Sequence, residues 1–379
     1  MLKIFFQPFI DLLLLWYPIK RAQPKRFAFL IHLRDINDLY RKFPFFKKLP
    51  ESFVLFLTKF LWPITVSKIT GLKNQENGEP MLGWVIGIPL TAQQMLEDRT
   101  LALKKIREAA ILSEKKGARV IGLGALTASL SKGGLDLVET VGVSITTGHA
   151  YTIYNVANTL LSIMEATGKR FSDSHLAVVG ASGSIGSGAT RFLSRNSFAK
   201  ITLIDVERKN SQLISLQEEL SKMAPLSKIS ISNTINDTKD ADLVITATNA
   251  PETLVRAHNL KSGAIVIDDA QPSDIDEEVF NRSDVLVLEA GAVRTPGISA
   301  NFNIDLQSPE DNFSCMAELL ILAAQDCASY KGLGPTTLQQ VDEIAALGEK
   351  MGFKLATFQN KNESISEEKI EHIRQLSKK

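Results

Sequence analysis

The chain has 379 residues, 44% of them hydrophobic and 22% charged, which is typical of a folded protein with two or three domains. A net charge of +1 excludes a generally basic nucleic-acid-binding chain, and only two cysteines, Cys315 and Cys327, exclude a secreted disulfide framework. We therefore expect a globular cytoplasmic protein with no nucleic-acid partner and, without a CxxC pair or Cys/His cluster, no metal site of the zinc type.

The first quarter of the chain is basic and aromatic. Residues 1–75 contain thirteen Lys and Arg against four Asp and Glu, and eleven of the nineteen Phe. The apolar stretch from Met1 to Ile19 is interrupted by charges and prolines, which argues against a membrane span, and no small-residue cleavage site of a signal peptide follows it. From Phe45 to Trp62 apolar residues recur at helical spacing, which predicts an amphipathic helix.

This predicted helix has two interpretations. It either packs on the core, or it lies on a membrane or lines an entry for an apolar substrate. The second interpretation implies membrane-surface contact through residues 1–66, and a cytoplasmic protein that is peripheral on the inner face of the membrane.

Strand and helix patterns alternate after a polar break at residues 73–80. The predicted elements are a strand at 81–88 closed by Pro89, a helix at 92–116 with Gly117 as C-cap, strands at 119–123 and 138–145, and a helix from Gly148 to about Thr167.

From His175 onward the pattern is that of a parallel sheet. The predicted strands are 176–179, 200–204, 243–246, 264–267 and 285–288, with a helix starting near Ala189 after the first. Helices at 313–330 and 337–351 follow, and the chain after about Asn360 reads as a charged, frayed tail. The fold class is therefore α/β: a Rossmann-type doubly wound parallel sheet, a preceding α/β domain and added helices. The expected divisions are an extension at 1–26, a substrate- or acyl-binding domain at 27–168, a dinucleotide-binding domain at 169–311 and C-terminal helices at 312–379.

A glycine-rich turn joins the first strand of this sheet to its helix. Gly180 permits the tight turn, Gly183 lets the backbone approach a pyrophosphate, and Gly186 lets the helix pack closely on the strand. The turn also precedes Asp205 by about 20 residues, as a dinucleotide site requires. The predicted cofactor-binding residues are Gly180, Ser182, Gly183, Ser184, Ile185, Gly186, Asp205, Arg208, Thr246 and Thr248.

The choice of nicotinamide cofactor stays open. Asp205, at the end of the second strand, is placed to hydrogen-bond a ribose 2′-hydroxyl, which favours NADH. Arg208 and Lys209 follow closely and suit the 2′-phosphate of NADPH. Thr246 and Thr248 follow a later strand, on the nicotinamide side of the site.

Cys315 lies at the predicted start of a helix. The helix dipole there lowers the pKa of a thiol and makes its thiolate more available as a nucleophile, whereas most free cysteines are small buried residues. Cys327 lies farther along the same predicted helix and is interpreted as packing. On an ideal helix the two cysteines point to different faces, which argues against a disulfide.

These features together resemble the cyanobacterial-type long-chain acyl-[acyl-carrier-protein] reductases, which form fatty aldehydes, with a two-domain plan like that of shikimate dehydrogenases. The resemblance covers roughly Phe27 to Phe353. It is carried by the segments Phe27–Leu33, Leu123–Ser129, Thr146–Gly148, Val179–Gly186, Phe313–Glu318 and Ala346–Glu349. The segment around Cys315 is the most specific of these.

The resemblance implies a two-step reduction of a long-chain acyl thioester, carried by acyl carrier protein or coenzyme A. Carried over by position, Cys315 takes the acyl group and the three glycines hold the pyrophosphate of the reduced cofactor, NADPH with NADH as the alternative. His149, at a predicted helix start, is the candidate for an acid–base role. The basic first quarter suits an acidic acyl carrier protein or an anionic lipid surface. An aldehyde-consuming enzyme is a further expected partner.

Two other classes of protein stay open. A two-domain dehydrogenase similar to shikimate or methylene-tetrahydrofolate dehydrogenases would transfer hydride directly, and Cys315→Ala would leave that activity intact. A nucleotide-sensing protein docked on membranes by its N-terminus would bind the cofactor and turn over nothing.

Overall fold

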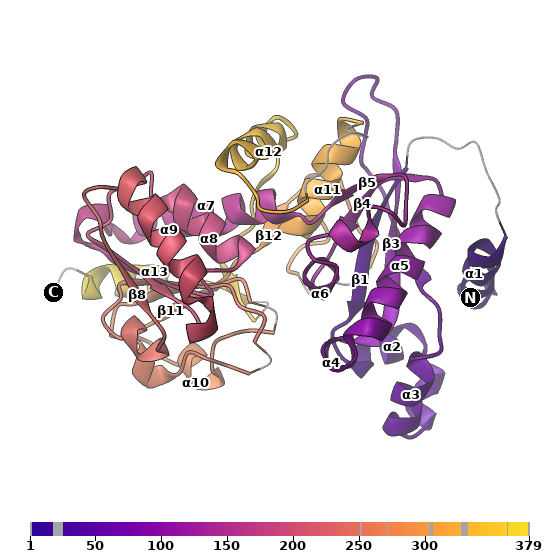
Figure 1. The fold of residues 1–379 in the computed structure, drawn as a ribbon, viewed down its shortest axis with the longest axis horizontal. Helices are drawn as coiled ribbons and strands as arrows, with labels where there is room; N and C mark the ends of the chain where they lie inside the picture. The colour runs from indigo at the N-terminus through magenta and orange to yellow at the C-terminus, as the bar shows by residue number, and fades with distance from the viewer. Residues whose placement is uncertain are drawn as a thin grey trace. The chain divides into compact units, whose positions relative to one another are not determined.

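The computed structural model describes residues 2–17, 26–250, 252–270, 272–302, 306–326, 333–361 and 363–377. The chain divides into two compact units, each with its own sheet (Figure 1). Unit 1 consists of Met1–His149, Arg294–Pro335 and Leu347–Phe353, and unit 2 of Ala150–Val293, Thr336–Ala346 and Lys354–Lys379.

Unit 1 is built on a five-stranded sheet with the order β2-β3-β1-β4-β5. The strands are β1 (Arg26–Leu33), β2 (Ile64–Ile69), β3 (Leu82–Thr91), β4 (Ala118–Leu123) and β5 (Ser144–Thr146). All neighbours pair in parallel except β2, which runs antiparallel to β3. The central parts of β1, β3 and β4 are apolar and buried because helices cover both faces of the sheet.

The two faces of this sheet are covered by helices that are far apart in the sequence. Ile121 of β4 packs in one apolar cluster with Ile106 of α5 (Arg99–Lys115). The next residue, Gly122, points to the other face, where an added Cβ would lie 3.0 Å from Leu319 of α11 (Ser314–Ala324). Successive side chains of a strand point to opposite faces of the sheet. Strand β4 therefore packs against α5 on one face and against α11 on the other.

Several predicted boundaries in unit 1 were wrong. Strand β3 continues through Pro89, where a register shift in its pairing with β1 accommodates the missing N–H. The predicted helix at 92–116 is two helices, α4 (Ala92–Glu97) and α5, because Asp98 ends the first and caps the second through Leu101 N at 2.9 Å. Gly117 adopts the predicted left-handed conformation, with φ +89°. Strand β5 is limited to Ser144–Thr146, because turns occupy much of the segment before it.

The single amphipathic helix predicted from Phe45 to Trp62 is also wrong. The segment forms a short 3-10 helix, η1 (Pro44–Lys48), and then α3 (Glu51–Thr58). The break lies at Leu49, whose extended backbone is the conformation that a following proline, Pro50, imposes. Ahead of this region lies α1 (Leu2–Trp16), and α2 (Ile36–Lys42) follows β1. Among the described residues, no helix is long and apolar enough to span a membrane.

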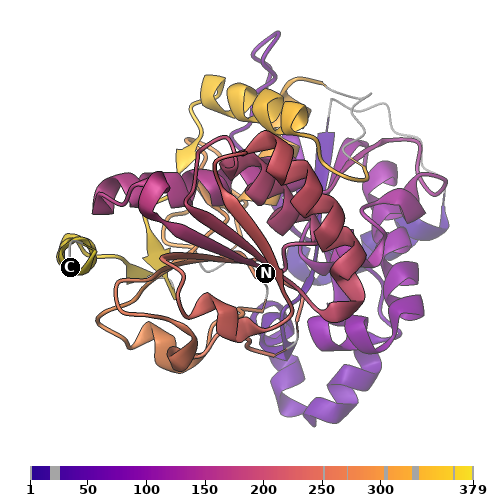
Figure 2. The ribbon, with the colours of Figure 1, turned by 60° about the vertical axis from the view of Figure 1, so that its left-hand side comes forward.

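Unit 2 contains a six-stranded, fully parallel sheet with the order β11-β10-β9-β6-β7-β8. The strands are β6 (His175–Val179), β7 (Lys200–Ile204), β8 (Lys228–Ser232), β9 (Leu243–Thr246), β10 (Ile265–Asp268) and β11 (Leu286–Glu289). Figure 2 shows the sheet fanned by its twist. This order confirms the predicted doubly wound Rossmann-type sheet. The sequence prediction missed β8, an edge strand with alternating Lys228, Ser230 and Ser232.

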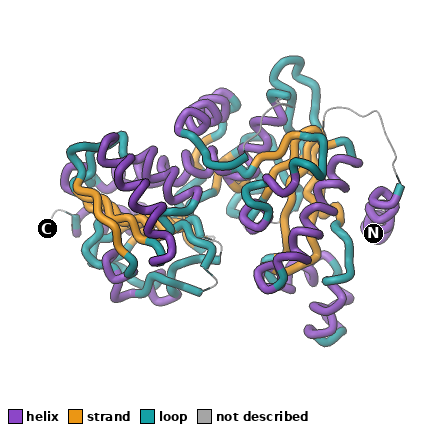
Figure 3. Tube along the Cα trace, in the orientation of Figure 1, coloured by secondary structure: helices purple, strands orange, loops and turns teal. Residues whose placement is uncertain are grey.

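Apolar side chains alternate between the two faces of this sheet. One face packs against α7 (His149–Thr167), α8 (Ser184–Leu193), α9 (Asn210–Met223) and α13 (Glu367–Leu376). The other face packs against α10 (Glu277–Phe280) and the segments around it. The separate strand and helix layers are visible in Figure 3.

The C-terminal segment is folded, so the predicted frayed tail was wrong. Ile370 and Ile373 of α13 are buried in the unit 2 core, and Arg374 Nε donates to the carbonyl of Ala166 at 3.0 Å. Apolar residues at helical spacing within a charged sequence were the overlooked signal. Helix α8 begins at Ser184, five residues before the predicted start, and α12 spans Leu338–Lys350. Cys327 lies outside the described residues.

Candidate functional site

The glycine-rich turn of unit 2 leaves no room for side chains at two positions. Gly180 has φ +79°, and an added Cβ would lie 2.6 Å from the carbonyl oxygen of Ala247. An added Cβ at Gly186 would lie 2.3 Å from the carbonyl oxygen of Gly180. The turn therefore packs directly against the backbone at the end of β9, where Ala247 lies between Thr246 and Thr248.

The start of α8 is suited to an anion. Gly183 is the N-cap residue, and no described side chain caps the helix. The first backbone N–H groups, from Ser184 to Gly186, have no partner within the helix and lie at the positive end of its dipole. A pyrophosphate placed here would accept these hydrogen bonds. The residues therefore fit a dinucleotide cofactor.

Asp205 lies at the end of β7, directly against the glycine-rich turn. One of its carboxylate oxygens accepts from the backbone N–H of Ser182 at 3.0 Å and from the Ser182 hydroxyl at 2.6 Å. Arg208 is exposed in the short helix η4 (Glu207–Lys209) that follows. The structure thus brings the acidic and the basic candidates for ribose recognition to the same end of the sheet.

Exchanging Asp205 for asparagine is expected to shift cofactor preference towards NADPH. The carboxylate accepts strongly from a ribose 2′-hydroxyl and repels a 2′-phosphate, and a hydrogen bond to a charged group is worth about 2 kcal/mol. The ratio of the Kd for NADH to the Kd for NADPH should therefore rise by about thirtyfold, measured by titrating nicotinamide fluorescence. Arg208→Ala is the opposite control and should weaken NADPH alone. Unchanged ratios in both variants would place the ribose elsewhere.

Thr246 and Thr248 are held by carboxylates that the sequence prediction missed. Thr246 Oγ1 donates to Asp268 at 2.7 Å, and Thr248 Oγ1 donates to Asp274 at 2.6 Å. Burial raises the pKa of Asp268, and burial together with the nearby Asp268 raises that of Asp269. Burial also raises the pKa of Asp274 to about 6. The available signal was the Asp268-Asp269 pair, which directly follows an apolar strand.

The raised pKa of Asp274 predicts a pH-dependent stability. Below about pH 4 the folded and unfolded states both hold its proton, and between about pH 4 and 6 only the folded state does. The unfolding free energy of the wild type relative to Asp274→Asn should therefore fall by about 3 kcal/mol between pH 4 and 7. Urea unfolding of both proteins across this range measures the difference. A difference that does not change with pH would contradict the prediction.

Cys315 of unit 1 lies in the first turn of α11 and is half-buried. No described side chain caps this helix at its N-cap residue, Phe313. The loop after β5 reaches the same point: Gly148 has φ +75°, and an added Cβ would lie 2.3 Å from the Cα of Cys315. His149, the other predicted catalytic residue, directly follows Gly148 in the chain.

A buried hydrogen-bond chain holds this loop against α11. The backbone N–H of Gly148 donates to Thr146 Oγ1 at 3.1 Å, and Thr146 Oγ1 donates to the carboxylate of Glu318. Glu318 is 1% exposed and lies one turn after Cys315. The sequence prediction assigned no role to either residue. The overlooked signal was a single acidic residue within the apolar helix Ser314–Ala324.

His149 is the first residue of α7, and its surroundings favour the neutral imidazole. Its Nδ1 is buried with no hydrogen-bond partner among the described residues. Burial lowers the pKa of His149 to about 4. At neutral pH the ring therefore carries one proton, and one of its nitrogens is able to accept another.

A second histidine, His32, lies at the same edge of the unit 1 sheet. The sequence prediction did not select it as a site residue. His32, near the end of β1, donates from Nδ1 to the carbonyl of Leu33 at 2.8 Å, and burial lowers its pKa. Ala125, just after the neighbouring strand β4, has the strained value φ +49°. The carboxyl ends of β1, β4 and β5 thus gather His32, Ala125 and Thr146 at the edge where parallel sheets usually bind ligands.

The two groups of candidate residues lie in different units. Unit 1 carries Cys315 and His149. Unit 2 carries Gly180, Ser182, Gly183, Ser184, Ile185, Gly186, Asp205, Arg208, Thr246 and Thr248.

Comparisons with known proteins agree with the dinucleotide-binding fold. Residues 162–294, which include all six strands of the unit 2 sheet, match the family model of shikimate / quinate 5-dehydrogenase. Among solved structures, the nucleotide-binding domain of glutamyl-tRNA reductase from Thermoplasma volcanium is 20% identical with a TM-score of 0.27, covering 35% of this chain and 84% of that chain. The family match indicates that residues 162–294 form a dehydrogenase-type, NAD(P)-binding domain.

Two curated proteins are similar over most of this chain. The aminotransferase PigE of Serratia sp. is 28% identical over 300 residues, which cover 76% of this chain and 34% of that protein. The long-chain acyl-[acyl-carrier-protein] reductase of Synechococcus elongatus is 25% identical over 275 residues, covering 67% of this chain and 76% of that protein. The chain thus spans about a third of the first relative and about three quarters of the second.

Proposed function

We propose that this protein reduces a long-chain fatty acyl thioester to the fatty aldehyde through an acyl-enzyme on Cys315. The observation that carries the proposal is the close approach of Gly148 to Cys315 in the first turn of α11, with His149 directly after Gly148 in the chain. The similarity to the long-chain acyl-[acyl-carrier-protein] reductase supports this substrate class. Acyl carrier protein is the proposed carrier, with coenzyme A as the alternative.

In the first step the Cys315 sulfur attacks the thioester carbonyl. A new carbon–sulfur bond forms as the bond to the carrier sulfur breaks, so the activated acyl group is conserved. His149, neutral before the step, takes the Cys315 proton and returns it to the departing carrier sulfur. Backbone N–H groups at the start of α11 stabilise the oxyanion that forms on the carbonyl.

In the second step the acyl group on Cys315 is reduced. NADPH or NADH, held by the glycine-rich turn, would supply the hydride for this reduction. The carbon–sulfur bond then breaks, the aldehyde leaves, and the start of α11 stabilises the Cys315 thiolate that is regenerated. The glycine-rich turn holds the pyrophosphate, while Asp205 or Arg208 selects the cofactor.

The proposal includes a location and a partner. The proposed site of action is the cytoplasm, with the protein peripheral on the inner face of the membrane. A fatty aldehyde is reactive and poorly soluble, so an aldehyde-consuming enzyme is a proposed partner.

A direct-hydride dehydrogenase is the second candidate, favoured by the match of residues 162–294 to shikimate / quinate 5-dehydrogenase. The two candidates differ in the role of the thiol. The deciding experiment is the intact mass of the protein after incubation with palmitoyl-acyl carrier protein in the absence of nicotinamide. We expect an increase of one acyl group that Cys315→Ala prevents and reduced cofactor discharges. No adduct would favour direct hydride transfer.

A further inference from the structure

Exposed apolar side chains are concentrated in one part of unit 1. Of the seventeen large hydrophobic side chains that are exposed in the described chain, eleven lie between residues 6 and 60. They are Phe6, Phe9, Ile10, Leu13, Trp16 and Tyr17 on and just after α1, and Phe45, Leu49, Phe53, Phe56 and Phe60 along η1 and α3. We call these eleven side chains the aromatic surface. Such a concentration marks an interaction surface.

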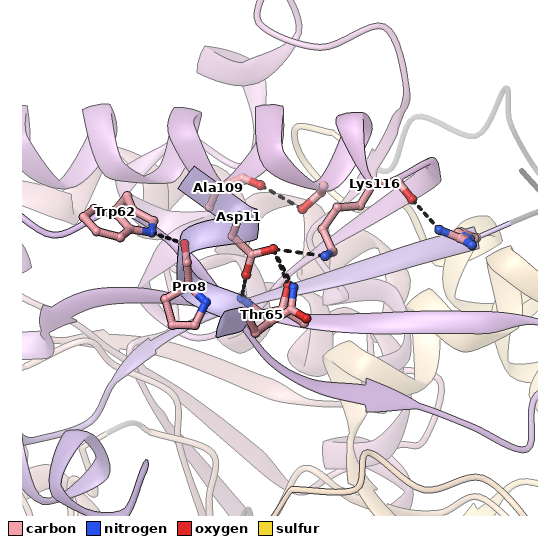
Figure 4. Close-up of polar contacts among 9 residues, drawn as sticks. Pro8, Asp11, Trp62, Thr65, Ala109 and Lys116 are labelled. Atoms are coloured by element: carbon pink, nitrogen blue, oxygen red, sulfur yellow. Dashed lines mark hydrogen bonds and ion pairs between the residues drawn. The ribbon is translucent and has the colours of Figure 1, made fainter. Parts of the chain in front are cut away.

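Buried polar contacts fix which face of α1 is turned inward (Figure 4). Asp11 is fully buried and accepts from the backbone N–H of Thr65 at 2.7 Å and from Lys116 Nζ at 3.1 Å. Trp62 Nε1 donates to the carbonyl of Pro8 at 2.7 Å. Breaking a buried ion pair on one side costs about 3–5 kcal/mol, so α1 is held in this orientation.

The outward face of α1 is therefore apolar. Leu14 and Leu15 pack on the core of unit 1 on the same side as Asp11. Phe9 and Leu13, spaced one turn apart, lie on the other side and are 60% and 55% exposed. A helix that is apolar on both sides belongs in an apolar environment.

Helix α3 is fixed in the same way and carries further exposed aromatic side chains. Val54 and Thr58 are fully buried, and the carbonyl of Leu55 accepts from Gln94 Nε2 at 2.7 Å. Phe56 and Phe60, their ring centroids 5.0 Å apart, are 55% and 68% exposed. The contact between Trp62 and Pro8 ties the chain just after Phe60 to α1.

Basic side chains accompany the aromatic surface. Lys47 and Lys48 of η1 and Lys59 at the end of α3 are exposed, within a segment, residues 1–75, that carries a net charge of +9. Lysines combined with Trp, Tyr and Phe are typical of surfaces that lie in the headgroup region of a bilayer.

We propose that the aromatic surface docks this protein on an anionic phospholipid bilayer. The lysines pair with lipid phosphates while the phenylalanines enter the boundary between headgroups and acyl chains. An acidic carrier protein would match the lysines but not eleven exposed apolar side chains, so the lipid surface is the better fit. The proposal goes beyond the enzymatic reaction and does not depend on it.

The experiment is flotation of the full-length protein with vesicles of phosphatidylcholine alone or mixed with phosphatidylglycerol. The wild type should bind the mixed vesicles. The triple variant Phe53→Ser, Phe56→Ser and Phe60→Ser should lose about tenfold in vesicle affinity per phenylalanine. The control Met223→Ser and Leu226→Ser removes exposed apolar side chains of unit 2 and should bind like the wild type.

A second triple variant tests the proposal independently, in case the phenylalanine variant misfolds. Lys47→Gln, Lys48→Gln and Lys59→Gln removes only exposed charges, and should weaken binding to anionic vesicles by about fivefold per lysine without changing the circular dichroism spectrum. Equal vesicle binding by wild type and both triple variants, or no binding by the wild type, would overturn the proposal.

Two other occupants of the surface would also overturn it. Light scattering that shows a dimer dissociated by the phenylalanine variant, with no vesicle binding, would assign the surface to a second copy of this chain. Loss of binding to acyl carrier protein in that variant, without loss of vesicle binding, would assign it to the carrier. Because flotation needs no turnover, its result is independent of whether Cys315 forms an acyl-enzyme.

Discussion

Cys315→Ala is expected to lower aldehyde formation from a long-chain acyl thioester by more than about a thousandfold, because no other group is proposed to carry the acyl chain. Cofactor binding should be unchanged, since the glycine-rich turn lies in unit 2 and Cys315 in unit 1. Gas chromatography of the aldehyde measures the first quantity, and a fluorescence titration with NADPH measures the second.

Cys327→Ala is the matched control for loss of a thiol, and it should retain wild-type turnover. Cys315→Ser adds a further test, because a serine hydroxyl at this position lacks an easily reached anionic form and should be almost as inactive as alanine. Wild-type turnover in Cys315→Ala would rule out the acyl-enzyme and leave the direct-hydride dehydrogenase as the remaining enzymatic candidate.

Gly148→Ala is the second substitution with a large expected effect. The added methyl carbon would lie 2.3 Å from the Cα of Cys315 and 2.9 Å from its carbonyl oxygen. Because these are backbone atoms, the backbone at the start of α11 would have to shift. Strain at φ +75° costs about 1–2 kcal/mol, and the overlap adds about 1–3 kcal/mol. We expect unit 1 to lose about 2–5 kcal/mol of unfolding free energy, and any activity that requires Cys315 to fall at least as steeply as in Cys315→Ser.

Gly78→Ala separates the two contributions. Gly78 belongs to the same unit and has φ +71°, but an added Cβ would meet nothing within 4 Å. This variant should therefore lose only the unfolding free energy that the strained backbone costs, and it should keep full activity. Equal destabilisation by the two substitutions, measured in urea, would show that Gly148 is not pressed against Cys315.

Local patterns in the sequence were sufficient to predict most of unit 2. The glycine-rich turn, the strands β6 and β7 and Asp205 lie within about thirty consecutive residues, and their spacing alone implies a dinucleotide site. The edge strand β8 was missed because Ser230 and Ser232 give it little apolar character. The helix of the tail was missed because its charged residues outweighed the apolar pair Ile370 and Ile373.

The sequence by itself thus determined the fold class and supplied the candidates for the cofactor site and the nucleophile, because each depends on residues that are close together in the chain. Only the tertiary structure decided what surrounds them. Thr146 and Glu318 are separated by 172 positions, and Asp11 and Lys116 by 105. No periodicity or spacing links such pairs, since their contacts exist only after the strands and helices have packed.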